Sequence, residues 1–417
     1  MKLSILLSHP GKQHSYQLLS ALHNAQFMTK YVTSIWYESN KFPYRLLNLL
    51  PANLRKIAIS KLEKYYQQDI SSLDIIQFPY IALLMMSYCK IRRRSNAEKG
   101  IFYLCKIHDK YVSKLIEKEP YDIVIGYELS SLRTFIKAKS HGMVTIMDHA
   151  QVHYKYIEYL RNTYHEFREL SLNNHFESRI NAFKNQEMKY TDYIICLSNL
   201  AKETMTNNGI EANRIYTVSL GFESKHFALK TFNKDKKSFT ILYVGTITKR
   251  KGLHVLLESF KQLNLQESNL ILVGGESDGM DLLEKYKGLY THIPFVRQDE
   301  LQKYYQDADV FVLPSILDSW GMVVLESMAC GTPVIISENT GAKDIVTDDA
   351  GFVIPVNDIK ALKERILFLY NNRNKIQDMG KKAYEIAQHY TWKNYKEKIK
   401  EIIIDIAKRS NKHKNPH

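Results

Sequence analysis

Short apolar runs alternate with longer stretches of helical periodicity along most of this 417-residue chain. The runs are rich in β-branched and aromatic residues, which favour strands, and the stretches between them are long enough for crossover helices. In the first half, strands are predicted at Lys2–Leu7, Tyr31–Ile35, Asp122–Gly126, Val144–Met147 and Tyr193–Leu197. In the second half, they are predicted at Phe239–Val244, Asn269–Val273, His292–Val296, Val310–Leu313, Pro333–Ser337 and Gly351–Ile354. This alternation predicts a doubly wound α/β fold.

The length of the chain favours two domains. The strand–helix rhythm runs through residues 1–216 and resumes in residues 217–391, with a hinge expected in the stretch Ile215–Phe222. We therefore expect one Rossmann-like domain on each side of the hinge. Residues 40–120 are rich in Lys, Arg and Tyr and break the rhythm, which predicts a helical insertion in the first domain. Residues 392–417 begin with a helix that carries an apolar stripe and end in a polar tail.

The net charge of +14 is concentrated in the first half, because residues 1–218 carry +10 of it. Such an excess suggests an acidic partner, either a nucleic acid or an anionic membrane surface. The chain contains no RNP, helix-turn-helix or zinc-finger pattern, so we do not expect nucleic-acid binding. The triplet Arg92–Arg94, next to Lys90 and Lys99, is a candidate for contact with anionic lipid headgroups. A solvated helix face explains these cations equally well.

No apolar run approaches the roughly 20 residues that a membrane-spanning helix needs, and the first run is too short for a signal peptide. The four cysteines, Cys89, Cys105, Cys196 and Cys330, lie far apart without a metal-like spacing. We expect buried, reduced thiols. These features predict a cytoplasmic protein, for which the inner face of the plasma membrane is a candidate peripheral location.

The most informative segment runs from Val310 to Pro333 and reads as a buried strand, a Pro-Ser turn, a polar loop and a helix. Gly331 stands where a helix ends in a left-handed residue. Gly321 precedes the helix and would let a ligand approach the backbone closely. The first-turn N–H groups, from Met322 onward, would face an anion.

Two carboxylates in this segment are candidates for binding sugar hydroxyls. Glu326 lies one turn into a largely apolar helix, where a carboxylate needs a partner, and the two hydroxyls of a ribose could supply it. Asp318, eight residues earlier in the loop, could reach hydroxyls of a second sugar. The competing interpretation is that Asp318 is a surface acid and that Glu326 pairs with a lysine.

The whole segment closely resembles the signature of the family 4 glycosyltransferases, which are retaining enzymes of the GT-B fold. The family frame is P-S-x-x-E-x-x-G-x-x-x-x-E-x-x-x-x-G-x-P, and the only fixed position that differs is Asp318, which replaces the first Glu. The resemblance implies two Rossmann-like domains that face each other across a cleft, with the last helix returning to the first domain. It also implies that Glu326 binds the donor ribose and that Asp318 stands where the family contacts the transferred sugar. The donor would further contact Ser319, Trp320, Gly321, Met322 and Val323.

A second match lies at Tyr243–Gly252, a strand followed by a glycine turn and a basic loop. Cations ahead of a helix start suit a diphosphate, although a solvated basic loop is an equally good explanation. In the family this loop reads G-R-x-x-x-x-K-G, with Arg and Lys on the diphosphate. Thr246 replaces the Arg, so Lys249 or Arg250 would supply that charge beside Lys251. The matching glycines are Gly245, Gly252 and, after the next strand, Gly274.

In the first domain, the resemblance points to two loops that follow predicted strands. The loop after the first strand has a single glycine of the family's Gly-rich turn, Gly11, which would approach donor phosphates and acceptor. The loop Asp148–His153 corresponds to a family loop that carries a histidine beside the transferred sugar. His149 and His153 are both candidates, and two structural histidines are the alternative.

The resemblance implies a retaining hexosyltransferase that uses a nucleotide-diphosphate sugar. Lys251, with Arg250 or Lys249, would neutralise the leaving diphosphate, so we expect neither a metal site nor a cofactor. The acceptor is expected to be a lipid-linked sugar or a polysaccharide of the cell surface, such as lipopolysaccharide or capsule. Two alternatives stay open: a catalytically weak subunit that assists another transferase, and a nucleotide-sugar 2-epimerase on the same fold.

Overall fold

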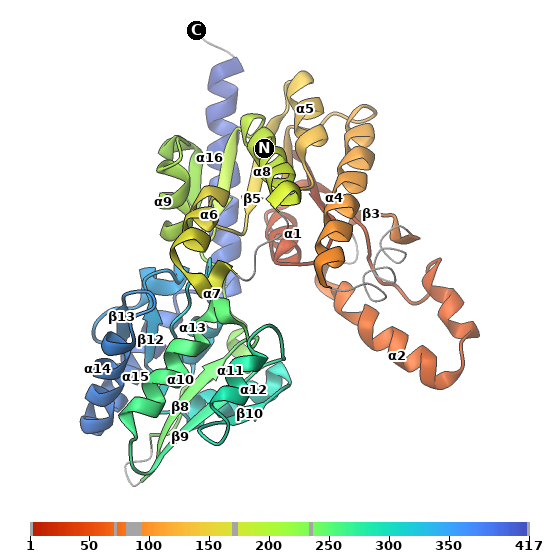
Figure 1. The fold of residues 1–417 in the computed structure, drawn as a ribbon. Helices are drawn as coiled ribbons and strands as arrows, with labels where there is room; N and C mark the ends of the chain where they lie inside the picture. The colour runs from red at the N-terminus through yellow and green to blue at the C-terminus, as the bar shows by residue number, and fades with distance from the viewer. Residues whose placement is uncertain (1–2, 71–72, 81–93, 169–173, 233–236, 415–417) are drawn as a thin grey trace.

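The computed structural model describes residues 3–70, 73–80, 94–168, 174–232 and 237–414, which form two parallel sheets with helices on both faces (Figure 1). The first sheet has the strand order β3-β2-β1-β4-β5-β6-β7 and the second β10-β9-β8-β11-β12-β13. Every pair of neighbouring strands is parallel. In each sheet, the chain first adds strands on one side of its first strand and then on the other side. Each sheet therefore has a topological switch point, between β1 and β4 in the first and between β8 and β11 in the second.

The first sheet consists of β1 (Ser4–His9), β2 (Met28–Thr33), β3 (Asp74–Gln77), β4 (Ile123–Tyr127), β5 (Val144–His149), β6 (Tyr193–Cys196) and β7 (Ile215–Thr217). In register, Ile5 of β1 lies between Thr29 of β2 and Ile123 of β4. Its helices are α1 (Ser15–Asn24), α2 (Ala52–Leu62), α4 (Arg94–Ile116), α5 (Leu132–Ser140), α6 (Tyr154–Thr163), α7 (His165–Arg168), α8 (Asn174–Lys189) and α9 (Asn199–Thr206).

The second sheet consists of β8 (Phe239–Val244), β9 (Ser268–Val273), β10 (Thr291–Ile293), β11 (Val310–Leu313), β12 (Val334–Ser337) and β13 (Gly351–Ile354). β8, β11 and β12 are buried along their whole length, as expected of apolar strands covered on both faces. The helices are α10 (Leu253–Leu263), α11 (Met280–Lys285), α12 (Gln298–Asp307), α13 (Met322–Ala329), α14 (Ile359–Asn371), α15 (Arg373–Ala387) and α16 (Trp392–Lys414).

The predicted strands are all present, with bounds that differ by two or three residues in β1 and β2, and the larger differences lie at the edges of the first sheet. β3 and α4 fall inside the predicted insertion at 40–120, yet they continue the α/β order as an edge strand and its crossover. The true excursion between β2 and β3 is shorter and consists of the short helices η1 (Tyr44–Leu49), η2 (Glu63–Tyr65) and η3 (Gln68–Ile70) with α2. The predicted hinge also begins with a strand, because Ile215–Thr217 form β7.

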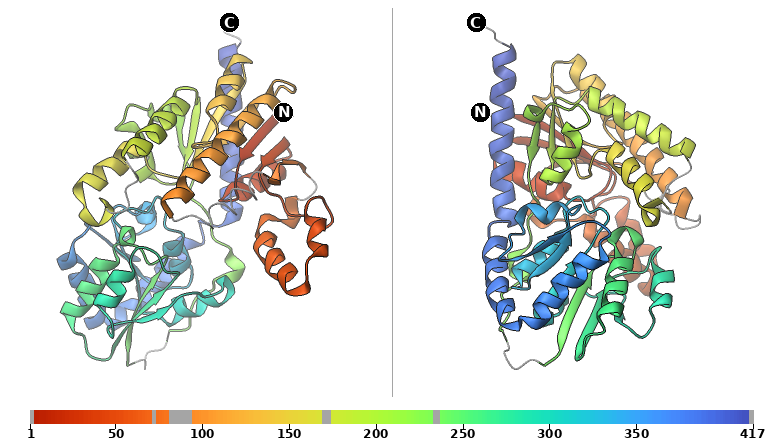
Figure 2. Two further views of the ribbon diagram at one scale, coloured as in Figure 1. Left: turned by 45° about the vertical axis from the view of Figure 1, so that its right-hand side comes forward. Right: turned by 60° about the vertical axis from the view of Figure 1, so that its left-hand side comes forward.

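The chain crosses twice between its two halves, and the two crossings lie side by side. Phe222 N–H donates to Tyr390 O at 3.0 Å, and Trp392 N–H donates to Phe222 O at 3.4 Å. α16 then runs from the second half along the first (Figure 2) and packs against α1, as predicted for the last helix. The hydroxyl of Tyr216 donates to Asp405 of α16 at 2.6 Å.

Over the residues that the structure describes, we find no helix long and apolar enough to cross a membrane. Cys105, Cys196 and Cys330 are buried free thiols, as predicted. Cys89, Lys90, Arg92 and Arg93 lie outside the described residues, and the lipid contact predicted for this cluster stays a prediction.

Candidate functional site

The predicted donor loops leave the carboxyl ends of β8 and β11, on the two sides of the switch point in the second sheet. Ligands of open α/β sheets bind at such points. Gly252, at the start of α10, has φ 70°, and a Cβ there would lie 1.8 Å from Pro314 O. The loop after β8 therefore packs backbone to backbone on the loop after β11, which only a glycine allows. This contact brings the basic loop to the acidic one.

Lys251 and Asp318 form an ion pair across these two loops. The side chains are largely buried, with 14% and 16% of their surface exposed. Burial lowers the pKa of Lys251, because it disfavours the ammonium, and the Asp318 carboxylate opposes that effect. Two of the residues predicted to be catalytic thus meet at one point.

The two neighbouring cations of the short helix η6 (Lys249–Lys251) have other partners. Lys249 Nζ lies 2.9 Å from Asp281 Oδ2 of α11. Arg250 NH1 donates to Leu317 O at 2.8 Å, in the same loop as Asp318. Arg250 therefore lies closer to the acidic loop than Lys249 does.

The Asp318 loop is held by backbone bonds to the loop after β12. Asp318 N–H donates to Asn339 O at 3.0 Å, and Gly341 N–H donates to Asp318 O at 2.8 Å. Gly321 follows with φ 91° and starts α13 in the left-handed region, as the sequence predicts. The loop after β12 was not predicted as part of the site.

Glu326 is buried in α13, with 8% of its surface exposed, and accepts a hydrogen bond of 2.9 Å from the hydroxyl of Tyr305 in α12. The lysine partner considered as an alternative is therefore wrong. Burial raises the pKa of Glu326 to about 7, and the Tyr305 hydroxyl lowers it in part. A neutral donor holds this carboxyl, so its charge is not compensated.

The raised pKa makes a stability prediction for Glu326→Gln. The protonated carboxyl stabilises the fold below the unfolded pKa, and this contribution is lost as the pH rises through about 7. Because Gln stays neutral, the variant should match the parent near pH 4 and be more stable by about 3 kcal/mol near pH 8. Melting curves across this pH range measure the difference. A difference that is the same at all pH values would contradict the ionisation of a buried Glu326.

The other predicted donor residues lie at three places. Gly245 and Gly274 lie at neighbouring strand ends, where a Cβ on Gly274 would lie 2.0 Å from Gly245 O. Met322 and Val323 are half-buried at the start of α13. Trp320 is buried in the core, with its ring 6.4 Å from that of Tyr390, so its side chain lines the core rather than an open site.

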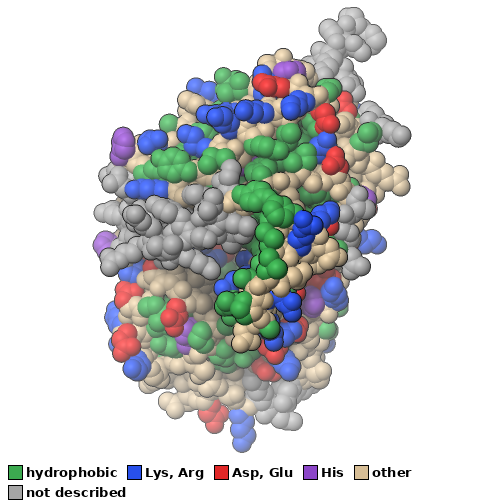
Figure 3. All heavy atoms as spheres, turned by 90° about the vertical axis from the view of Figure 1, so that its right-hand side faces the viewer, with side chains coloured by type: hydrophobic (Ala, Val, Ile, Leu, Met, Phe, Trp, Pro, Cys, Tyr) green, Lys and Arg blue, Asp and Glu red, His purple; other side chains and the backbone are tan. Residues whose placement is uncertain are grey.

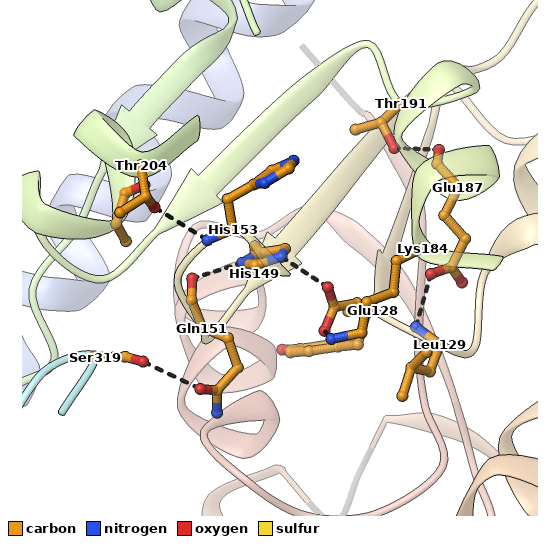
Figure 4. A network of polar contacts seen from close by, with 12 residues as sticks. Glu128, Leu129, His149, Gln151, His153, Lys184, Glu187, Thr191, Thr204 and Ser319 are labelled. Carbon is orange, nitrogen blue, oxygen red and sulfur yellow. Dashed lines mark hydrogen bonds and ion pairs between the residues drawn. The ribbon is translucent and has the colours of Figure 1, made fainter. Parts of the chain in front are cut away.

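In the first sheet, His149 lies at the end of β5 in a polar network (Figure 4). Its Nδ1 is 2.7 Å from Gln151 O and its Nε2 is 3.0 Å from Glu128 Oε1. Lys184 Nζ lies 2.8 Å from the other oxygen of Glu128. Burial alone would raise the pKa of Glu128, but Lys184 and His149 together hold it well below its ordinary range. Each ring nitrogen of His149 therefore already has a hydrogen-bond partner within the first sheet, the Gln151 carbonyl on one side and Glu128 on the other.

His153 has a structural role in the same loop. Its Nδ1 accepts from Lys155 N–H at 3.3 Å and caps the start of α6, and its own N–H donates to Thr204 Oγ1 at 3.0 Å. Burial, with the nearby charge of His149, lowers the pKa of His153 to about 4. Gln151, between the two histidines, accepts a hydrogen bond of 3.1 Å from Ser319 (Figure 4). The histidine loop and the Asp318 loop therefore touch, although neither ring forms the contact.

Gly11, in the loop after β1, donates its N–H to His9 Nδ1 at 2.8 Å. Burial lowers the pKa of His9 to about 4, so the ring is a neutral acceptor. Nearby, His14 Nε2 lies 2.8 Å from Asp148 Oδ2 at the end of β5. This His14–Asp148 pair joins residues that are far apart in sequence.

A buried carboxylate shapes the loop after β4. Glu187 of α8 accepts from Leu129 N–H at 2.7 Å and from Ser131 N–H at 2.8 Å. Leu129 has φ 71°, an uncommon conformation for a branched residue, and the bond to Glu187 stabilises it. The sequence gives no signal for Glu187, which lies in a polar helical stretch.

Within the ranges that the structure describes, no group of three or more His, Cys, Asp or Glu side chains has an arrangement that could hold a metal ion.

The second half of the chain is similar to proteins that are already known. Residues 224–386 match the family Glycosyl transferases group 1. The capsular polysaccharide biosynthesis glycosyltransferase CapM of Staphylococcus aureus is 32% identical over 200 residues, which are 45% of this chain and 51% of CapM. The chain thus spans about half the length of the curated relatives it matches.

Solved structures match almost the whole fold. Sucrose-phosphate synthase from Thermosynechococcus elongatus has a TM-score of 0.67 at 17% identity, with 96% of this chain and 98% of that chain covered. HepE from Anabaena, solved in complex with UDP, has a TM-score of 0.63 at 14% identity, with 97% and 100% covered. The predicted GT-B fold is confirmed.

Proposed function

Because residues 224–386 match the family Glycosyl transferases group 1, we propose that the chain is a glycosyltransferase that uses a nucleotide-diphosphate sugar. The observation that supports this most directly is the Lys251–Asp318 pair at the switch point of the second sheet. A cation for the diphosphate and a carboxylate for sugar hydroxyls are thereby adjacent. We further propose a hexose as the transferred sugar.

The donor would lie along the carboxyl edge of the second sheet. Glu326 would accept hydroxyls of the ribose, and Lys251 with Arg250 would neutralise the diphosphate. The N–H groups at the start of α13 point to the same edge, after Gly321. Because these cations and N–H groups would balance the charge of the diphosphate, we propose a transfer that needs no metal and no cofactor.

The proposed reaction retains the configuration of the sugar. The bond between the anomeric carbon and the diphosphate oxygen breaks, and the acceptor oxygen forms its bond on the same face. The acceptor proton passes to the leaving diphosphate, so no protein base is required. Two observations agree with this scheme: both ring nitrogens of His149 already have hydrogen-bond partners, and the pKa of about 4 makes His153 a weak base. We assign both residues to positioning the loop that contacts Ser319.

The proposed acceptor is a lipid-linked sugar or a polysaccharide in surface polysaccharide biosynthesis. CapM, one of the similar proteins, is named for capsular polysaccharide biosynthesis. The proposed place of action is the cytoplasmic side of the membrane, where nucleotide sugars are available.

Nucleotide binding tests the proposal directly. Thermal shifts of the purified chain with UDP, GDP, ADP and CMP, and with their sugar conjugates, should single out one base without added metal. Ligand at about 100 times Kd stabilises the fold by about 2.7 kcal/mol. Glu326→Ala should abolish the shift, and Glu364→Ala, an exposed acid on α14, should preserve it. If no nucleotide shifts the melting temperature, the chain is not an active transferase and the assisting-subunit alternative is favoured.

A further inference from the structure

The excursion between β2 and β3 forms a lobe of residues 38–66 that projects outward beside the β3 edge of the first sheet (Figures 1 and 2). Six large hydrophobic side chains between residues 42 and 57 are exposed, by 39% to 81% of their surface. They are Phe42, Leu46, Leu49, Leu50, Leu54 and Ile57. Single exposed hydrophobic residues are ordinary, but a run of this density marks an interaction surface.

The lobe has an inner face that explains why it is folded. Tyr37, Tyr44 and Leu62 form a small core of their own, and the hydroxyl of Tyr44 donates to Gln77 of β3 at 2.8 Å. Among the residues that the structure describes, no comparable cluster covers the remaining face of α2. Leu54 and Ile57, three residues apart, share one side of the helix and are 55% and 52% exposed.

An uncovered helix of this length is unusual. α2 has 11 residues, and Leu62 is the only one of them that is buried. Helices this short are marginal in water and normally depend on packing of an apolar face. The exposed side of α2 therefore fits a helix that completes its packing on a partner.

The charge of the lobe indicates the kind of partner. Residues 38–66 contain six Lys or Arg and two Glu, a net charge of +4. Arg55 and Lys56 are consecutive and exposed beside Leu54 on α2, and Arg45 lies over the ring of Phe42. Figure 3, which faces this side of the molecule, shows hydrophobic side chains in a band with Lys and Arg beside them.

We propose that the lobe of residues 38–66 is a docking surface for an anionic lipid bilayer. Leucines and isoleucines that project between cations are typical of helices that lie in the membrane interface. Each cation near an anionic leaflet adds to the attraction. A protein partner fits less well, because the core of a protein interface is depleted of lysine.

The lobe is also close to the loop after β1. Burial lowers the pKa of Lys12 in that loop, and the charge of Lys64 at the end of the lobe lowers it further, which places the two cations near each other. The hydroxyl of Tyr16 in α1 donates to Tyr65 O at 3.0 Å. A bilayer on the lobe would thus lie beside the loop that contains Gly11. The docking itself does not depend on the proposed transferase activity.

The experiment measures binding of the full chain to vesicles of phosphatidylcholine with and without phosphatidylglycerol. We expect binding to the anionic vesicles that weakens as salt is added. Leu49→Ser/Leu54→Ser and Arg55→Gln/Lys56→Gln should each weaken it by roughly tenfold or more. All four residues are exposed, so the fold should be kept, and unchanged melting temperatures verify this.

Matched controls come from the second half of the chain. Phe295→Ser/Leu367→Ser removes hydrophobic side chains of similar exposure, 79% and 40%, and Lys381→Gln/Lys382→Gln removes a consecutive exposed pair from α15. Both controls should bind like the parent. Equal losses in lobe and control variants, or no binding to anionic vesicles, would overturn the proposal. Self-association without lipid that is lost in Leu49→Ser/Leu54→Ser would instead assign the surface to a second copy of the chain.

Discussion

Replacing Lys251 with methionine is expected to lower kcat/KM for the preferred donor by about two to three orders of magnitude. The side chain is largely buried at the switch point, where a fixed charge acts in a low dielectric and needs no reorganisation as the diphosphate leaves. Methionine keeps most of the volume and removes the charge. Steady-state kinetics with the nucleotide sugar identified by thermal shifts measures the effect.

Lys249→Met is the matched control, because this lysine pairs with Asp281, whose side chain is 60% exposed. The Lys249 side chain is as buried as that of Lys251, with 14% exposed, but its partner is exposed to solvent and lies outside the Asp318 loop. We therefore expect a loss of no more than about tenfold. If the two variants lose the same activity, the charge of the loop as a whole matters and Lys251 has no special role. An unchanged kcat/KM in Lys251→Met would show that Lys251 does not neutralise the leaving diphosphate.

The double variant Lys251→Met/Asp318→Asn separates catalysis from packing. In the single variant, Asp318 is left as a largely buried carboxylate without its partner, which destabilises the fold. The double variant removes that charge and should recover melting temperature. Turnover should not recover, because neither the phosphate cation nor the sugar carboxylate is present. Recovery of both would mean that Lys251 serves only to neutralise Asp318.

The central strands were predictable because they are buried on both faces. β8 and β11 were predicted with the observed bounds, and each is a continuous apolar run. The edge strands β3 and β7 were missed. β3 (Asp74–Gln77) is only partly buried, and β7 (Ile215–Thr217) has three residues, so neither gives a clear apolar run.

The site was predictable where it follows a local motif. Lys251 and Asp318 each belong to a strand–loop–helix segment, and the fold brings the two segments together. Partners that depend on long-range folding left no trace in the sequence. Asp148 and His14 are 134 positions apart, and the Tyr305 hydroxyl that holds Glu326 comes from the preceding helix.

The roles of His149 and His153 also depend on partners that the sequence does not reveal. A histidine beside a strand end suggests chemistry, but its role depends on what its ring nitrogens meet. Glu128 and the Gln151 carbonyl occupy both nitrogens of His149, and the Lys155 amide engages His153. These contacts depend on the loop conformation, which apolar periodicity does not determine.

Gly252→Ala is expected to be the most destabilising small substitution in the donor loops. Its φ of 70° strains an alanine, and the new Cβ would lie 1.8 Å from Pro314 O, so one of the two loops must move. We expect a loss of about 2–5 kcal/mol in stability and a fall of about 5–15 °C in melting temperature. Differential scanning calorimetry measures it.

Gly142→Ala separates strain from the clash. Gly142 has φ 71°, almost the same value, but no atom lies within 4 Å of the position of its Cβ. In this control, the free energy of unfolding should therefore fall only by the backbone strain, about 1–2 kcal/mol. The excess in Gly252→Ala measures how closely the two loops must approach. Gly252→Ala, unlike Gly142→Ala, should also lose its nucleotide-induced thermal shift, because a displaced loop separates Lys251 from Asp318. Equal melting temperatures for the two variants would contradict the close packing of the donor loops.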